Sequence, residues 1–518
     1  HSVASIPDIL QNTTRSVFTS DYYRPLPFIF YAIIYNYFQD NVFIFHLTQV
    51  LFHIANVILI LLIFKKYLKL SVIFFLSLVF LLHPINESTV VYIANMQDVL
   101  FVFFGLLSLL LLQQNKVNLK NIIFSNIFLL LSLLSKETGI LFFIVAFVYL
   151  LFFKKTKLLV HTAFSFIVGF VYILMRIHAH IPLQKDPIEP IMTLNFGERM
   201  LQVPSIIFYY IKIFIYPKDL ILLHTTIIQN IQFHNFFLPL IMDFIACLIL
   251  VLTAIFIYKK TKKTKLILFS LIWFVVGLLA HLQILPLDYT VADRFFYFPM
   301  IGLLLFLGLF FQSIKVSKAT EIIFLSLGIL LLFFLSIRTM VRNANWQNQE
   351  TLITHDEKLS HNDYQQELLY GVALGNQNKL DMALIHVKKA ITIYPRAWIA
   401  WDTFGALYIK KGDILNAKKA LNTSISIDSL YFSPYENMAM ILWEHDSADK
   451  TRAFTTRATA LFPYSAKLWY YRFLSDYATK NFDDALLSSK NYYILKRDSE
   501  SYEIYYRMQK KLPIHFTK

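Results

Sequence analysis

Ten apolar runs fill the chain between about residue 42 and residue 340, with short polar turns between them. Several runs approach the roughly 20 residues that a helix needs to cross a bilayer. Helices are the expected form, because no run shows the alternation of a membrane barrel. The sequence therefore predicts an all-α chain that begins as a polytopic transmembrane helical bundle. The runs are roughly 42–64, 70–84, 88–112, 120–135, 138–153, 158–177, 237–258, 266–282, 295–312 and 319–338.

The composition agrees with this interpretation. Of the 518 residues, 57% are hydrophobic and 16% are charged, whereas a soluble domain has about 25% charged residues. These values exclude a disordered or collagen-like chain. They also argue against a soluble enzyme, whose interior could not cover so many Phe, Ile and Leu side chains. The single cysteine, Cys247, excludes a disulfide scaffold.

Lysines gather in the turns between alternate apolar runs, which places these turns on one side if every run crosses once. The positive-inside rule makes that side cytoplasmic. The net charge of +15 is then largely a matter of topology, and we expect no nucleic-acid partner. The clusters are Lys65/Lys66/Lys69, Lys116/Lys120, Lys154/Lys155/Lys157, Lys259/Lys260/Lys262/Lys263/Lys265 and Lys315/Lys318.

Two apolar segments, 24–40 and 201–217, break this alternation. We expect each to be an interfacial or re-entrant helix on the outer face, with Lys212 reaching the interface. Residues 1–41 are then an external loop with an interfacial helix, and 42–342 are the transmembrane domain. If the native protein begins in the cytoplasm, a further span precedes His1.

From about residue 343 the composition becomes mixed, and a 34-residue period appears. Pro395 and Pro463 lie two periods apart, and small residues recur in 364–397 and 398–431. Two worn copies follow, so the pattern resembles tetratricopeptide repeats. An irregular helical domain is the alternative. We expect residues 343–518 to form a tetratricopeptide-repeat α-solenoid on the external face, where its concave groove would bind an extended peptide.

Charged residues at the outer ends of the apolar runs are functional candidates, because charge is costly at membrane depth. Each also has a structural alternative. His83 could cap a helix, and Asp98 could pair with a nearby Asn or Arg. Lys136 and Glu137 could form an ion pair in a tight turn. Arg294 could reach lipid headgroups.

Four ordered strings carry a family resemblance. They are YYRPL followed by FHLTQVLFHIANVIL, then HPINESTVVYIANMQDVL, LLSKETGI and ADRFFYFPMIG, with Trp346 and the repeats after them. They resemble the motifs of the transmembrane-and-tetratricopeptide O-mannosyltransferases. The resemblance implies a GT-C fold and transfer of a sugar from a polyprenyl-phosphate donor to a protein (Ser/Thr) or glycan acceptor. The Lys-, Asn-, Ile- and Phe-rich composition suggests a bacterial cell membrane and an undecaprenyl-type lipid.

Carried over residue by residue, the resemblance implies eight site residues. Glu87 and Asp98 are the catalytic candidates, because the acceptor hydroxyl needs a base. Cations would stabilise the phosphate leaving group. The substrate-binding candidates are Arg24, His83, Lys136, Glu137, Asp293 and Arg294. Some GT-C enzymes use a divalent metal and others do not, and the sequence holds no closed ligand set.

This chain departs from the family pattern in two places. The acidic pair of the first outer loop lies upstream of His1 in the family, and neither Asp8 nor Asp21 matches it. The principal catalytic acid is therefore expected upstream of this chain, or catalysis is lost. Gln97 also replaces an arginine of the family motif.

Two other classes of protein stay open. An O-antigen ligase or polymerase would need a large basic outer loop, and the loop near 178–236 offers one. A non-catalytic scaffold would use its repeats to recruit partners to the membrane. The residues that keep the ligase interpretation open are Arg176, His178, His180, Arg199, His224 and His234.

Overall fold

The computed structural model describes residues 22–179, 189–222, 224–360 and 362–514. The described part of the chain is all-helical, with 80% of the described residues in helices. In the described ranges the only β feature is a single bridge between His224 and Val291. The chain divides into two compact units, His1–Ser360 and His361–Lys518. The first unit therefore extends beyond the expected boundary near 342 and includes α16.

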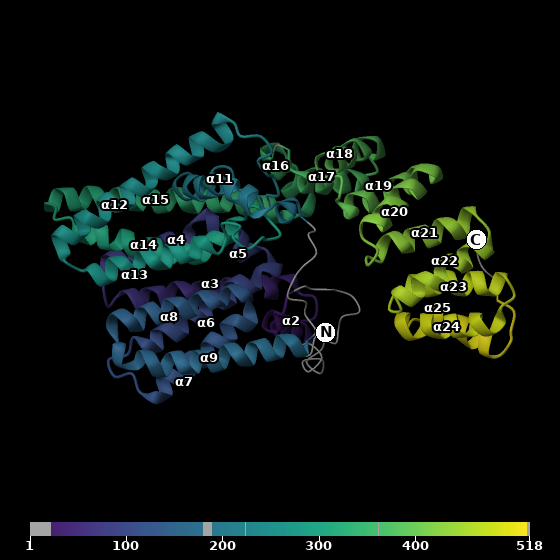
Figure 1. The fold of residues 1–518 in the computed structure, drawn as a ribbon, viewed down its shortest axis with the longest axis horizontal. Helices are drawn as coiled ribbons and strands as arrows, with labels where there is room; N and C mark the ends of the chain where they lie inside the picture. Colours follow the sequence, from purple (N-terminus) through teal and green to yellow (C-terminus); the bar gives the residue numbers. More distant parts are fainter. Residues whose placement is uncertain (1–21, 180–188, 223, 361, 515–518) are drawn as a thin grey trace. The chain divides into compact units, whose positions relative to one another are not determined.

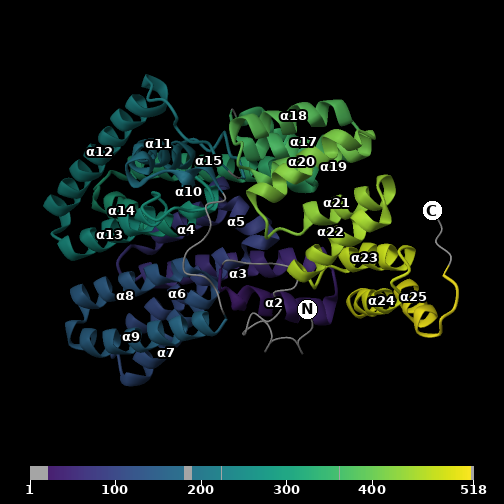
Figure 2. The same cartoon turned by 45° about the vertical axis from the view of Figure 1, so that its right-hand side comes forward.

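Every apolar run of the first unit folds into helix, as the hydropathy predicts, and the helices run alongside one another (Figures 1 and 2). Short 3-10 turns, η2 (Pro84–Asn86), η3 (Ile93–Asn95), η4 (Glu137–Gly139) and η6 (Asp293–Phe296), precede α5, α6, α8 and α14. The helices are α2 (Pro25–Phe38), α3 (Val42–Phe64), α4 (Leu70–Leu82), α5 (Glu87–Val91), α6 (Met96–Leu112), α7 (Leu119–Ser135), α8 (Ile140–Phe153), α9 (Lys155–His178), α10 (Pro190–Thr193), α11 (Phe196–Ile215), α12 (Leu238–Thr261), α13 (Thr264–Leu279), α14 (Tyr297–Ser313), α15 (Lys318–Ala344) and α16 (Gln349–Leu359).

Six helices in the described residues are long and apolar enough to cross a membrane, or up to seven if α4 and the bent α5 segment form one span. We expected about ten spans. The difference lies in α7, α8 and α13, which have 17, 14 and 16 residues. At 1.5 Å per residue, such helices fall short of a hydrocarbon core of about 30 Å.

Three of the long helices expose their apolar side chains almost entirely. Only 11% of the apolar window of α9 is buried, and 6% in α12 and in α15. Contact between water and a contiguous apolar surface of this extent is unfavourable. These exposed surfaces are consistent with a membrane protein.

The five lysine turns lie at one end of the first unit. Lys66 Nζ donates to the Gln113 carbonyl at 2.8 Å, and Lys154 Nζ donates to the Asn115 carbonyl at 2.9 Å. The Lys69 amide donates to Gln312 at 2.7 Å, and the rings of Phe256 and Phe310 lie 5.9 Å apart near the ends of α12 and α14. We call this end the basic end.

The two segments that break the alternation lie at the opposite end. Arg199, near the start of α11, donates to the Gln283 carbonyl after α13. The carbonyl of Phe214, at the other end of α11, contacts His83 after α4. In α2, Tyr31 donates to the Ile93 carbonyl in η3. Both helices thus contact connections of one end only, which agrees with helices that do not cross.

The second unit is a succession of helix pairs. The second helices of the pairs begin at Leu380, Ile414, Ala448 and Phe482, with a spacing of 34 residues. The helices are α17 (Tyr364–Asn376), α18 (Leu380–Ile393), α19 (Trp398–Lys411), α20 (Ile414–Ile427), α21 (Ser433–His445), α22 (Ala448–Leu461), α23 (Ala466–Ala478), α24 (Phe482–Lys496) and α25 (Ser499–Gln509).

Equivalent residues of these pairs make equivalent contacts. Trp401 Nε1 donates to the Pro395 carbonyl at 2.9 Å, and Trp469 Nε1 donates to the Pro463 carbonyl at 2.7 Å. A Cβ on Gly371 would lie 2.5 Å from Val387 of the paired helix. The small residues thus allow the close helix contacts that the 34-residue period predicts.

We predict opposite labelling of the two ends in intact cells, in a Cys247→Ser background. Tyr92→Cys, at the end opposite the basic end, should react with an impermeant maleimide, and so should Leu415→Cys in α20. Lys116→Cys and Lys263→Cys should react only after permeabilisation, because lysine-rich turns face the cytoplasm. Labelling of Lys263→Cys in intact cells would contradict this assignment, because it would place the lysine turns on the outer side.

Gly302 should be intolerant of a side chain. A Cβ there would lie 2.6 Å from the Phe274 amide nitrogen of α13, so Gly302→Ala should destabilise the unit by about 1–3 kcal/mol through overpacking. Gly169→Ala is the matched control, because nothing lies within 4 Å of its Cβ position. Thermal unfolding in detergent should separate the two variants, and equal melting temperatures would contradict this packing.

Candidate functional site

The candidate residues lie where helices break, at the end of the first unit opposite the lysine turns. Each apolar run ends there in a 3-10 turn or an extended residue, which leaves polar side chains between helix ends. Arg24 precedes α2, Asp98 lies in the first turn of α6, and Lys136 links α7 to η4. Side-chain contacts join these positions across long stretches of sequence, and they form two neighbouring clusters.

Lys136 and Asp98 form a buried ion pair. The Nζ–Oδ1 distance is 2.6 Å, and the side chains are 7% and 2% exposed. Among the described residues, Asp98 Oδ2 has no hydrogen-bond partner. Burial lowers the pKa of Lys136, and the neighbouring Asp98 opposes that shift. The alternative that Lys136 pairs with Glu137 is wrong, because each residue pairs with a different partner.

Arg24 holds Glu137. Its Nε and Nη2 each lie 2.8 Å from Glu137 Oε2, and its Nη1 donates to Gln97 Oε1 at 3.0 Å. The guanidinium lies 3.9 Å from the centre of the Tyr22 ring. Gln97 therefore accepts a hydrogen bond from Arg24. An arginine at position 97 would place a second cation beside Arg24.

Arg294 carries a guanidinium without a carboxylate partner. It is half-buried and lies 5.1 Å from the centre of the Tyr289 ring and 5.3 Å from that of Phe295. Lys136 Nζ lies 5.5 Å from the same Phe295 ring. Within the part of the chain that the structure describes, Arg294 makes no side-chain hydrogen bond and no ion pair. We call Arg24, Asp98, Lys136, Glu137 and Arg294 the cation cluster.

A second cluster surrounds Arg342, which is fully buried. Arg342 Nη1 donates to Asp356 Oδ1 at 2.8 Å, and its Nε lies 3.8 Å from Glu87 Oε2. Asp293, next to Arg294 in sequence, accepts a 2.5 Å hydrogen bond from the Tyr209 hydroxyl. Burial opposes the charge of Asp356, but hydrogen bonds from His355 and Arg342 hold its pKa below the usual range.

Sequence reasoning missed Tyr209, Arg342 and Asp356. Arg342 ends the last apolar run, and its charge at that depth was a usable signal. Tyr209 and Asp356 carry no such signal, because only the fold brings α11 and α16 to this cluster. The Arg342–Asp356 pair also explains why α16 belongs to the first unit.

His83 has the geometry of a helix cap. Its Nδ1 accepts from the Ile85 amide at 3.2 Å, and its Nε2 contacts the Phe214 carbonyl at 3.0 Å. The ring also stacks on Phe214 with centroids 5.3 Å apart. Both ring nitrogens contact the backbone, so His83 is a cap, but it caps the start of η2 and not the last carbonyls of α4 as expected. A substrate contact by His83 stays a prediction without support from this geometry.

Two residues of the long basic loop make structural contacts, and the ligase interpretation stays untested. Arg199 donates to the carbonyls of Leu194 and Gln283, so it fastens loops together. His224 takes part in the backbone bridge to Val291. His180, and likewise Asp8 and Asp21, lie outside the described residues.

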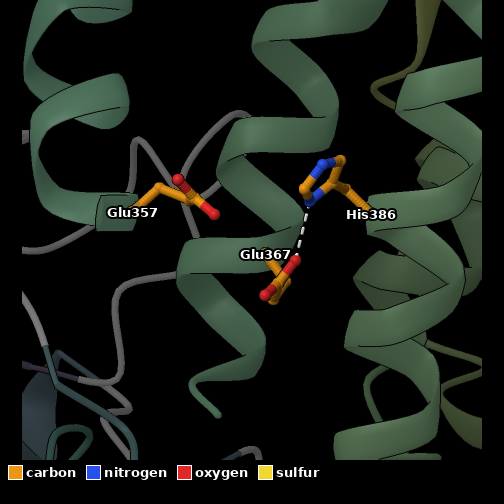
Figure 3. Close-up of side chains that lie close together, drawn as sticks. All are labelled: Glu357, Glu367 and His386. Atoms are coloured by element: carbon orange, nitrogen blue, oxygen red, sulfur yellow. Dashed lines mark hydrogen bonds and ion pairs between the residues drawn. The ribbon is translucent and has the colours of Figure 1, made fainter. Parts of the chain in front are cut away.

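Within either unit, the described residues hold no group of three His, Cys, Asp or Glu ligands close enough for one metal ion. Figure 3 shows Glu367 of α17 facing His386 of α18, at 2.8 Å. Lys389 also pairs with Glu367, which neutralises this carboxylate. Glu357, drawn beside them, belongs to α16 of the first unit. The need for a divalent metal stays an open expectation.

No protein-family model matches the chain, and no curated protein sequence matches it. The family resemblance therefore depends on the four strings of the sequence alone.

We predict that removal of one partner of the Lys136–Asp98 pair destabilises the protein strongly, whereas removal of both partners destabilises it little. Asp98→Leu or Lys136→Met alone should cost about 3–5 kcal/mol, because each leaves a buried charge without a partner. The double variant should recover most of that loss. Detergent unfolding midpoints would measure this coupling.

The control pair is Lys212–Asp219, at 2.8 Å but with side chains 45% and 32% exposed. Lys212→Met should change stability by about 1 kcal/mol or less. A double variant as unstable as the sum of its single variants would contradict the buried pair.

Proposed function

We propose that the protein is a multi-pass membrane glycosyltransferase. It would take a sugar from a polyprenyl-phosphate donor and transfer it to a hydroxyl of a protein or glycan acceptor at the outer face. In this proposal the first unit is a GT-C-like helical bundle and the second a tetratricopeptide-repeat solenoid.

The unpaired guanidinium of Arg294 carries the proposal. Within the cation cluster, Arg24 and Lys136 each pair with a carboxylate, whereas Arg294 forms no ion pair among the described residues. A guanidinium fork suits two phosphate oxygens at once. The Tyr289 and Phe295 rings contact Arg294 without accepting from its N–H groups, which leaves these groups available for an anion.

The apolar surroundings of this cluster fit a lipid-linked donor. Helices α7 and α8, which meet at Lys136 and Glu137, expose Ile and Phe side chains along their other surfaces, namely Ile123, Phe124, Ile144 and Phe147. A donor with a polyprenyl chain would place its chain along such surfaces and its phosphate at the helix ends. A soluble nucleotide sugar has no apolar chain that could bind along these surfaces.

The reaction breaks the bond between the anomeric carbon and the phosphate oxygen and forms one from that carbon to the acceptor oxygen. The bonding electrons leave with polyprenyl phosphate, whose charge Arg294, Arg24 and Lys136 would stabilise. The acceptor proton needs a base. Asp98 is the better candidate in this chain, because Lys136 holds its Oδ1 while Oδ2 has no partner among the described residues. Glu87, beside Arg342, is the second.

The second unit would present the acceptor. Its helix pairs at 34-residue spacing are typical of solenoids whose concave surface binds extended peptides. Tethering such a groove to the site would raise the local acceptor concentration to about the millimolar range if both can be engaged at once.

We predict that Arg294→Ala abolishes sugar transfer and that Arg294→Lys loses most of it, because an ammonium cannot bind two phosphate oxygens in plane. The assay incubates the full-length native protein in detergent with labelled polyprenyl-phosphate sugars and a Ser/Thr peptide. Arg457→Lys, exposed on α22, is the control and should keep full activity. Unchanged turnover in Arg294→Ala would refute this role.

Removal of residues 361–518 should separate the two units functionally. Transfer to a short free peptide should persist, whereas transfer to a whole protein acceptor should fall about tenfold or more as the effective concentration is lost. The two acceptors are compared at equal concentration. Equal losses for both acceptors would show that the second unit is part of the folded catalytic unit.

A further inference from the structure

The basic end of the first unit has a surface that the proposed chemistry does not use. Its most charged part is the connection between α12 and α13, where five lysines occupy positions 259 to 265. All five are exposed. None of the five lysine turns contains Asp or Glu, and the acid that follows them most closely is Glu321, after Lys318. This charge is therefore not compensated locally.

The α12–α13 turn also adjoins one of the two most exposed apolar helices of the unit, α12. Only 6% of the apolar window of α12 is buried, and its last turns expose Leu252, Ile255 and Tyr258. The lysines bend back toward this surface. Lys262 Nζ lies 4.7 Å from the centre of the Tyr258 ring, and Lys260 Nζ lies 5.9 Å from that of Phe256.

Ammonium groups above aromatic rings, directly next to a bare aliphatic surface, match the layers of one bilayer leaflet. The aliphatic side chains fit the acyl region, the rings fit the interface, and the lysines lie at the level of the headgroups. Soluble acidic partners would match the lysines but not the adjoining apolar surface. The combination favours a lipid with a negative headgroup.

We propose that the α12–α13 turn is a binding site for anionic phospholipid, in which Lys260, Lys262 and Lys263 hold the headgroup phosphate and the end of α12 holds the acyl chains. The site depends on placement of the first unit in a bilayer and not on sugar transfer, because it lies at the end opposite the cation cluster.

The other lysine turns differ in a way that supplies a control. Lys154 is half-buried and already donates to the Asn115 carbonyl, and Lys66 donates to the Gln113 carbonyl. Part of their charge thus fastens neighbouring turns together. In the α12–α13 turn the structure shows no side-chain hydrogen bond or ion pair for any of the five lysines.

The experiment is native mass spectrometry of the full chain released from nanodiscs that contain phosphatidylglycerol and phosphatidylcholine in equal amounts. Wild type should retain phosphatidylglycerol at least fivefold in excess, since each lysine near an anionic surface contributes about 1 kcal/mol. The triple variant Lys260→Gln/Lys262→Gln/Lys263→Gln should lose most of that preference. The matched variant Lys154→Gln/Lys155→Gln/Lys157→Gln should keep it.

Sedimentation and far-UV circular dichroism should be used to check that both triple variants are folded. Equal retention of the two lipids by wild type would overturn the proposal. An equal loss in both variants would also overturn it, because the charge of the whole end would then bind lipid without a specific turn. Binding of an added RNA oligonucleotide by the wild type in place of lipid would also overturn the proposal.

Discussion

Unpaired charge is unfavourable among the apolar helices of the first unit, and this constraint decides where its charged side chains lie. Most lysines that lack acidic partners lie in turns at the basic end. At the other end, most charges are compensated in pairs, such as Lys136 with Asp98 and Arg342 with Asp356. The interior between the two ends uses neutral polar contacts, such as the hydrogen bond between His53 and Tyr297.

This separation makes Arg294 informative. A half-buried guanidinium that lies near two rings and has no carboxylate partner differs from Arg24, Lys136 and Arg342 of the same site, which each pair with a carboxylate. Exceptions of this kind are expected where a ligand supplies the missing charge. Asp98 is a related case, because one oxygen is held by Lys136 while the other faces no partner in the described part of the chain.

Much of this organisation could be predicted from the sequence, because hydropathy and lysine spacing are local signals. The apolar runs became helices, and the lysine turns gathered at one end. The 34-residue period also appeared as helix pairs, with Gly371 and Ala417 at close contacts. The number of long spans could not be predicted as well, because the shortest apolar runs fold into helices of 14 to 17 residues, which are too short to cross a bilayer alone.

Partner choice inside the site was not predictable. Lys136 and Glu137 are adjacent in sequence, which favours a local pair, yet extended backbone at Lys136 directs the two side chains to Asp98 and Arg24. His83 could not be assigned as a cap until the position of Phe214 was known. Tyr209 and Asp356 belong to segments whose place in the fold depends on tertiary contacts, so no local pattern marks them.

The most direct test of the account is equilibrium binding of a short-chain, water-soluble prenyl monophosphate to the purified full chain, measured by calorimetry. Wild type should bind it, and the control Arg457→Ala should bind it equally well. Arg294→Ala should bind at least tenfold more weakly, because it lacks the one guanidinium of the cluster without a carboxylate partner. Equal binding by wild type and Arg294→Ala would contradict the assignment of this cluster as a phosphate site.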